Sequence, residues 1–202
     1  MSILNRNDQS GRSMVEMLGV LAIIGVLSVG GISGYSKAMA KYKLTKAQDQ
    51  ITMLLMNIRT AYATSPSYDG LNSATAAAYN LAPNEMVNGA GSTATLNGTF
   101  GGAVNVGTIS GSPTYFYIQL TNLGKEACRT LLSSDWGADG MVGIWAAATA
   151  AGSSSGATCT AHTTASANVA SASWCVHDLP VSIGQAHYAC SGEVNSITWV
   201  YY

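Results

Sequence analysis

Residues 17–36 read MLGVLAIIGVLSVGGISGYS and contain no charged side chain. At a rise of 1.5 Å per residue, a helix of about 20 residues spans about 30 Å, the thickness of a bilayer's hydrocarbon core. The run exceeds the usual apolar core of a signal peptide, and no A-x-A site ends it. We therefore predict a helix that can span a membrane. Length and composition alone do not distinguish a permanent membrane anchor from a helix with a further role.

One carboxylate, Glu16, stands at the front of this apolar run. A charge near the membrane core is costly unless it is paired or lies close to the interface. Two structural explanations for this carboxylate must be weighed against a functional role. Glu16 marks the water-facing end of the helix, or Ser13 and Glu16 form the S-x-x-E capping box that opens a helix.

Beyond residue 36 the apolar residues recur at helical spacing, which predicts an amphipathic continuation of the same helix. We predict one helix from about residue 13 to residue 63, ended by Ser65-Pro66. The first half needs lipid or neighbouring helices, whereas the second packs one side against a globular domain. Polar residues, among them Gln50, Asn57 and Arg59, are assigned to the other faces. The apolar stripe comprises Tyr35, Ala38, Met39, Tyr42, Ala47, Ile51, Leu54, Leu55, Ile58 and Tyr62.

The rest of the chain predicts short strands and helices in one head region. Alternating valines and a Tyr-rich segment predict strands at residues 104–106 and 115–120, separated by a turn at 111–113. Further strands are expected at residues 141–145 and 197–202, and helices at 73–79 and 124–132. The Ala/Ser/Thr tract at residues 146–172 receives no assignment.

Charge and cysteine content limit the classes of function that the chain can have. The net charge is -1 and only 9% of residues are charged, so there is no electrostatic case for nucleic acid or an acidic substrate. Four cysteines lie in the C-terminal half, and an even number in an exported chain indicates disulfides. Four cysteines allow three pairings. The competing interpretation is a zinc site formed by Cys175, His177, His187 and Cys190, although this spacing lacks the tight C-x-x-C pair.

Residues around Gly11 resemble the processing site of the type IV prepilins. In that family a short polar leader ends in Gly, and a hydrophobic helix follows with Glu as its fifth residue. Cleavage after Gly11 makes Arg12 the first mature residue and Glu16 the fifth. Glycine at the cut has no side chain to obstruct a protease. The chain departs from the family pattern at Arg12, where the family usually has Phe or another apolar residue.

A second motif narrows the resemblance to the type IVb branch, which includes the bundle-forming pilins, and to the thin-pilus pilins of conjugative plasmids. The pattern is F-G-G-x-x-N-V-G, a Tyr-rich strand, then L-T-x-L-x-K-x-A-C. The residues that match it are Phe100, Gly101, Gly102, Asn105, Val106, Gly107, Leu120, Thr121, Leu123, Lys125, Ala127 and Cys128.

The resemblance implies an α+β fold. A long N-terminal spine helix, its apolar half protruding, packs on an antiparallel sheet, with a disulfide-bounded C-terminal region. The type IVb pattern implies that Cys128 pairs with Cys190, leaving Cys159 with Cys175. The resemblance to the family divides the chain into a leader (1–11), a transmembrane and assembly segment (12–36), an amphipathic helix (37–64) and a globular head (65–202).

The resemblance also implies a function in assembly, without enzyme activity or a cofactor. We expect the major subunit of a type IVb pilus, a helical homopolymer that serves adhesion, aggregation or conjugation. A prepilin peptidase would cut after Gly11, Arg12 would be N-methylated, and Glu16 would act in assembly. The precursor would lie in the bacterial inner membrane with the pilus assembly machinery, and the product in an extracellular fibre. The alternatives are a minor pilin, a type II secretion pseudopilin and a membrane-anchored enzyme or binding protein. His177 beside Asp178 suggests general-base chemistry, but no nucleophile motif accompanies it, and a partly exposed loop histidine explains it more simply.

Overall fold

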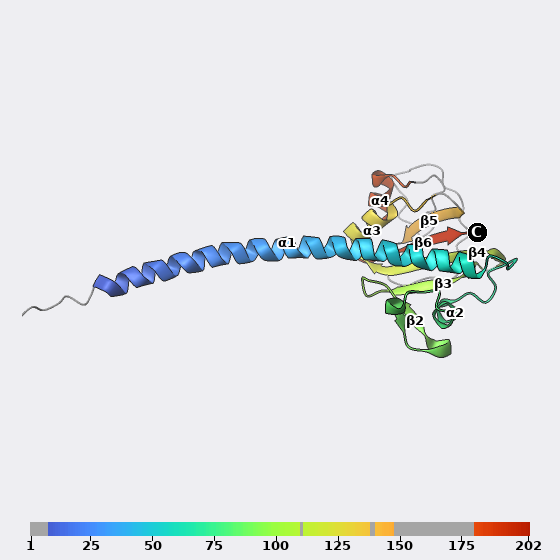
Figure 1. Cartoon of the computed structure of the whole chain (residues 1–202). Coiled ribbons are helices and arrows are strands. Elements are labelled where there is room, and N and C mark those ends of the chain that lie inside the picture. The colour runs from blue at the N-terminus through green and yellow to red at the C-terminus, as the bar shows by residue number, and fades with distance from the viewer. Residues whose placement is uncertain (1–7, 110, 138–139, 148–179) are drawn as a thin grey trace, which may run out of the picture. The chain divides into compact units, whose positions relative to one another are not determined.

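The computed structural model describes residues 8–109, 111–137, 140–147 and 180–202, with side chains from residue 14 onward. The chain divides into two compact units, Met1–Tyr42 and Lys43–Tyr202. Helix α1, Asp8–Ala61, belongs to both (Figure 1). Because α1 begins before Ser13, that residue lies inside the helix. The Ser13–Glu16 capping box proposed as a helix start is therefore wrong.

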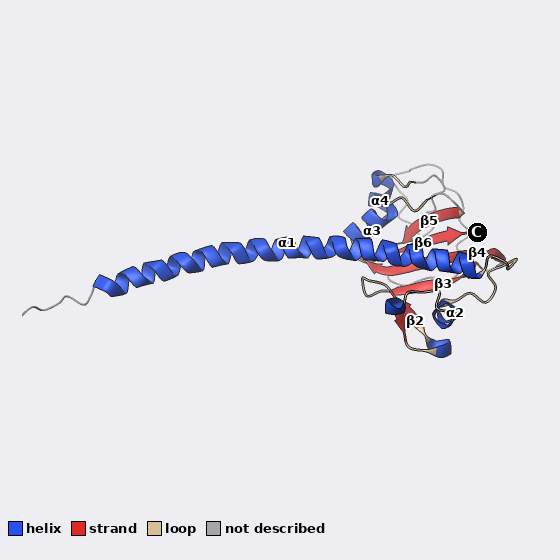
Figure 2. Cartoon of the chain, viewed as in Figure 1, coloured by secondary structure: helices blue, strands red, loops and turns tan. Residues whose placement is uncertain are grey.

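The second unit contains a six-stranded antiparallel sheet in the order β1-β2-β3-β4-β6-β5 (Figure 2). The last strand of the chain thus lies between β4 and β5, and it joins the two halves of the sheet. The strands are β1 (Val87–Asn88), β2 (Thr95–Asn97), β3 (Ala103–Ile109), β4 (Ser112–Leu123), β5 (Met141–Ala147) and β6 (Asn195–Tyr201). The expected antiparallel sheet is confirmed.

Short helices flank the sheet. The expected helices are present as α2 (Ser73–Ala78) and α3 (Lys125–Leu132). The helix α4 (Ile183–Ala189) and the two single-turn 3-10 helices η1 (Asn84–Met86) and η2 (Gly91–Thr93) were not expected. The turn between β3 and β4 is shorter than expected, because Ser112 and Pro113 already belong to β4 and Ser112 pairs with Ile109.

One face of the sheet carries the main core, and the second half of α1 covers it (Figure 1). Ile118 of β4 pairs with Trp199 of β6, which pairs with Ile144 of β5, and all three side chains are buried. The alternation of strand residues places these side chains on the same face. The α1 residues in this core are Ala47, Ile51, Leu54, Leu55 and Ile58.

The opposite face carries a row of polar side chains at the sheet centre. Asn105 donates from its amide to Gln119 Oε1 at 3.0 Å, and Gln119 donates to Thr198 Oγ1 at 3.0 Å. Gln119 and Thr198 are buried. The row therefore satisfies side chains that would be costly to bury alone, and it ties β3, β4 and β6 in one register.

The C-terminal region is bounded by a disulfide between Cys128 on α3 and Cys190, directly after α4. Both residues are fully buried, and their Cα atoms lie 5.8 Å apart. The expected Cys128–Cys190 pair is confirmed. Cys159 and Cys175 lie outside the described residues, as does the tract at 148–179.

Candidate functional site

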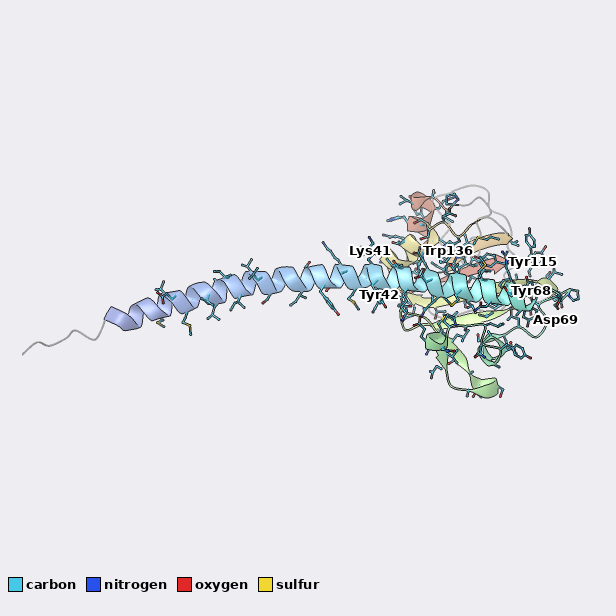
Figure 3. The ribbon with its side chains drawn as sticks, viewed as in Figure 1. Lys41, Tyr42, Tyr68, Asp69, Tyr115 and Trp136 are labelled. Atoms are coloured by element: carbon cyan, nitrogen blue, oxygen red, sulfur yellow. A yellow bond between two sulfur atoms is a disulfide. The ribbon has the colours of Figure 1, made fainter. Side chains whose placement is uncertain are left out.

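The first half of α1 is apolar on all sides and exposed in the single chain. Its large apolar side chains between residues 14 and 35 are each 52% to 75% exposed. Figure 3 shows side chains projecting from both visible sides of this helix. Within the described part of the chain, this helix alone is long and apolar enough to cross a membrane. Such a surface needs lipid or other protein to cover it.

The residues of the expected processing and assembly site all lie on α1. Gly11 and Arg12 have helical backbone, and Glu16 is exposed one turn further along. Between residues 14 and 36, Glu16 is the one ionisable carboxylate in the apolar segment. The structure thus places Glu16 on the helix that carries the uncovered apolar surface.

Five glycines punctuate the same segment, and none has a packing role within the single chain. A Cβ built on any of them would meet nothing within 4 Å. Glycine in a helix interior costs about 0.5–1 kcal/mol relative to alanine. No contact in the single chain therefore explains these glycines, whereas close approach of a second helix would. They are Gly19, Gly25, Gly30, Gly31 and Gly34.

The second half of α1 differs from the prediction at the start of its apolar stripe and at Gln50. Tyr35, Ala38 and Tyr42 were expected on a buried stripe, yet they are exposed. The buried stripe begins at Ala47. Gln50 was assigned to another face, yet it is buried beside Ile51, because spacings of three and four place it on the buried stripe with Ala47 and Leu54.

Gln50 is the centre of a polar cluster that holds the segment before β3 against α1; we call Lys46, Gln50, Glu85 and Thr99 the α1 clamp. Gln50 Nε2 donates to Glu85 Oε1 at 2.6 Å, and Thr99 Oγ1 donates to Gln50 Oε1 at 2.7 Å. Lys46 Nζ lies 3.0 Å from Glu85 Oε2. The hydrogen bond from Gln50 and the ion pair with Lys46 lower the pKa of Glu85. The clamp therefore gives a hydrogen-bond partner to both the NH₂ group and the carbonyl oxygen of the buried Gln50 side chain.

Aromatic side chains hold the C-terminal end of α1 to the sheet. Tyr68, labelled in Figure 3, contacts Tyr62 and Phe116 with ring centroids 5.3 and 4.5 Å apart. Phe116 stacks on Tyr201 at 5.6 Å, and the Arg59 guanidinium lies over the Tyr201 ring. Burial raises the pKa of Tyr201 well above its usual range, and the charge of Arg59 opposes that shift.

The F-G-G motif has a steric explanation. Gly101 has φ +78°, a backbone conformation that residues other than glycine rarely adopt. A Cβ on Gly102 would lie 2.1 Å from the carbonyl oxygen of Thr121, so only glycine fits there. Gly107 lies beside the Tyr117 ring, where a built Cβ would lie 2.9 Å from Oη and the ring would have to shift. The motif thus lets β3 approach β4 closely.

The second motif places its polar and sulfur groups around α3. Lys125 and Glu193 form an ion pair, and this pairing lowers the pKa of Glu193. Three residues further along α3, Cys128 forms the disulfide with Cys190. The motif therefore connects α3 to the segment after α4 by two contacts, one ionic and one covalent.

The zinc and general-base interpretations gain no support. Cys190 is bonded to Cys128 and cannot be a thiolate ligand, and His187 is exposed beside Tyr188. Cys175, His177 and Asp178 lie outside the described residues. Among the residues that the structure describes, no group of three potential ligands lies together.

Sequence reasoning missed several residues that hold the head together. The buried Asn195 donates to the Leu123 carbonyl and accepts from the Gly192 amide, which closes the turn before β6. The helix α4 begins with a capping box in which Ser182 and Gln185 exchange hydrogen bonds. The S-x-x-Q pattern at residues 182–185 was the signal for that helix.

A family model described as PilS N terminal matches residues 41–201 of the chain. Two relatives have the same description, "Major structural subunit of bundle-forming pilus", one from Escherichia coli O127:H6 (strain E2348/69 / EPEC) and one from Escherichia coli O111:H-. Each is 26% identical over 136 residues, which cover 67% of this chain and 69% of the relative.

Solved structures share the fold. TcpA, a type IV pilin from Vibrio cholerae El Tor biotype, superimposes with a TM-score of 0.54 at 16% identity, over 80% of this chain and 99% of that one. The type IV b pilin from Salmonella typhi gives a TM-score of 0.52 at 18% identity, over 79% of this chain and 97% of that one.

Proposed function

This chain belongs to the PilS N-terminal family and is a type IVb pilin, and on that premise we propose that it is the major subunit of a pilus. The family and fold are those of structural subunits and not of enzymes. The relatives from Escherichia coli are described as major structural subunits, which supports the same role for this chain.

The observation that carries the proposal is the apolar half of α1, exposed on all sides in the single chain. In the precursor this surface would lie in the inner membrane, and in the fibre it would be covered by the same helix of other subunits. The unexplained glycines support close helix packing in the fibre. Transfer from lipid to fibre would require the inner-membrane assembly machinery as a partner.

We propose that a prepilin peptidase cuts after Gly11 and that the amine of Arg12 is then methylated. The division would be a leader at 1–11, an assembly segment at 12–36, an amphipathic segment at 37–64 and a head at 65–202. Gly11 and Arg12 lie in helical backbone, so the peptidase would have to unwind the first turns of α1 around the scissile bond.

Glu16 would then pair with the N-terminal amine of a neighbouring subunit. An unpaired charge in an apolar bundle is costly, so a neighbour in the wrong register would leave Glu16 unsatisfied. Glu16 would therefore set the register of the fibre, while the apolar surface supplies most of the association free energy.

The test compares Glu16→Ala and Glu16→Gln with Asp49→Asn, which removes an exposed carboxylate from the same helix within the head. We expect both Glu16 variants to insert in the membrane but to yield at least about tenfold fewer pili, because a buried amine left unpaired costs several kcal/mol. Asp49→Asn should assemble normally. Normal pili from both Glu16 variants would rule out the register role.

Intact mass and N-terminal sequencing of chains from sheared pili test processing and stoichiometry together. A predominant chain that begins at methylated Arg12 supports the major-subunit proposal. If this chain is only a trace component of the fibre, it is a minor pilin or pseudopilin instead. A chain that retains residues 1–11 and forms no polymer would favour the membrane-anchored alternative.

A further inference from the structure

The chain contains two Asn-Gly steps at opposite ends of the β1–β2 segment, Asn88-Gly89 and Asn97-Gly98. An Asn-Gly step is the sequence most prone to spontaneous deamidation, because glycine has no side chain to shield its backbone nitrogen. The two steps share their chemistry, and both asparagines are exposed. Differences in reactivity must therefore come from the surrounding structure.

The reaction is an intramolecular substitution. The backbone nitrogen of the glycine attacks Cγ of the asparagine, a new N–Cγ bond forms, and the Cγ–Nδ2 bond breaks. Ammonia leaves with the proton from the glycine N–H, and a cyclic imide remains. Solvent water then opens the imide at either carbonyl and yields aspartate or isoaspartate. The glycine nitrogen must be free of hydrogen bonds, and the backbone must be able to rotate.

Asn97-Gly98 does not meet these conditions. The Gly98 amide donates to the Gly102 carbonyl at 2.8 Å, and the Gly98 carbonyl accepts from the Gly101 amide at 2.9 Å. A Cβ built on Gly98 would lie 2.4 Å from Leu120 Cδ1, so this backbone is packed against the core. The next residue, Thr99, is held by Gln50 in the α1 clamp.

Asn88-Gly89 is restrained less: the hydrogen bonds beside Gly89 are two long ones of 3.4 Å, from Thr95 Oγ1 to the Asn88 carbonyl and from Thr93 Oγ1 to the Ala90 carbonyl. β1 is only two residues long and lies at the edge of the sheet, where Asn88 pairs with Thr95. Gly89 is exposed, and the atoms nearest to a built Cβ are 3.8 Å away. Among the described backbone hydrogen bonds of turns and loops, the Gly89 amide donates none. Short edge strands with few contacts open locally at low free-energy cost.

We propose that Asn88 is a site of spontaneous deamidation in the folded protein and that Asn97 is protected by the fold. Each modified copy gains one negative charge at the edge of the head, in a chain with few charges. Isoaspartate also adds a methylene to the backbone of β1, which weakens its pairing with β2.

The experiment incubates the full-length chain in detergent at mildly alkaline pH and follows both sites by peptide mapping with mass spectrometry. Isoaspartyl methyltransferase identifies the isoaspartate. We expect deamidation at Asn88 to be at least about tenfold faster than at Asn97 in the folded chain. In urea, where the fold is absent, both sites should react at comparable rates.

Asn88→Gln serves as the variant control, because the longer side chain cyclises slowly, and it should abolish the fast phase of ammonia release. Equal rates at both sites in the folded chain would overturn the proposal. So would a difference that persists unchanged in urea, since the local sequence and not the fold would then set the rates. An unmodified Asn88 in a folded chain whose urea control reacts would overturn it as well.

Discussion

The apolar side chains of α1 are exposed in the first half of the helix, whereas one stripe of them is buried in the second half. Between residues 14 and 35 the large apolar side chains are all exposed, whereas Ile51, Leu54 and Ile58 are 0% to 1% exposed in the core of the head. Both halves share one continuous helical backbone. The comparison indicates that the head completes its own core by folding, while the first half depends on lipid or on other subunits.

The largest effect that separates the two halves should come from the Cys128–Cys190 disulfide, which closes a loop with a sequence separation of 62. We expect Cys128→Ser with Cys190→Ser to lower the free energy of unfolding of the head by about 4 kcal/mol, because the unfolded chain gains freedom. Urea denaturation of the full-length chain in detergent measures this. Membrane insertion should be unchanged, and a loss of insertion would mean that the halves are coupled.

A pair of identical substitutions on the same helix sharpens the comparison. Leu54→Ala removes a fully buried side chain and should lower the free energy of unfolding of the head by about 3 kcal/mol. Leu27→Ala, at a position 68% exposed, should leave that free energy unchanged and reduce only the yield of pili. Calorimetry and pilus yield give the two readouts. Similar losses of head stability in both variants would contradict the division.

A smaller effect tests the polar part of the second half of α1. Gln50→Ala leaves the hydroxyl of Thr99 without its acceptor and removes one of the two partners of the Glu85 carboxylate, which keeps its ion pair with Lys46. We expect a loss of about 2 kcal/mol in the free energy of unfolding. Gln48→Ala, which removes one half-buried hydrogen bond to Ser134, is the matched control and should cost less. The reverse order would mean that the α1 clamp adds little to stability.

The smallest effect is pH-dependent. The hydrogen bond from Gln50 and the ion pair with Lys46 lower the pKa of Glu85, so its contribution to stability is complete above the usual pKa of glutamate, about 4.3. The contribution falls as pH drops through the lower pKa of the folded state. Glu85→Gln should therefore reduce stability at neutral pH and remove part of its acid dependence. Stability curves against pH that run parallel for both proteins would refute this.

Much of the head could be predicted because its elements carry strong local signals. The Tyr-rich segment is β4, the K-x-A-C segment is α3, and the final residues are β6. The misses have physical reasons. β1 and β2 are too short to show alternation, and α4, with seven residues, is too short to show a helical period despite its capping box. The Ser13–Glu16 motif failed as a helix start because α1 already begins at Asp8.

The candidate site divides in a similar way. Gly11, Arg12 and Glu16 were identified from the sequence, since their register is a local pattern, and their roles stay a prediction. The α1 clamp was missed because Gln50, Glu85 and Thr99 come from three distant segments. Gln50 was assigned to another face because it is polar, although helical spacing places it on the buried stripe.

The sequence by itself determined the local features of this protein: an uncharged helix long enough to span a bilayer, its amphipathic continuation, and the main strands. Only the tertiary structure decided that β6 lies between β4 and β5, that Gln119 and Thr198 satisfy each other on a buried face, and that Asn97 is protected while Asn88 is not. The physical reason is the separation along the chain over which each kind of interaction acts. Hydrophobic period and turn chemistry act between near neighbours, whereas strand order and burial of polar groups depend on contacts between residues far apart in the chain.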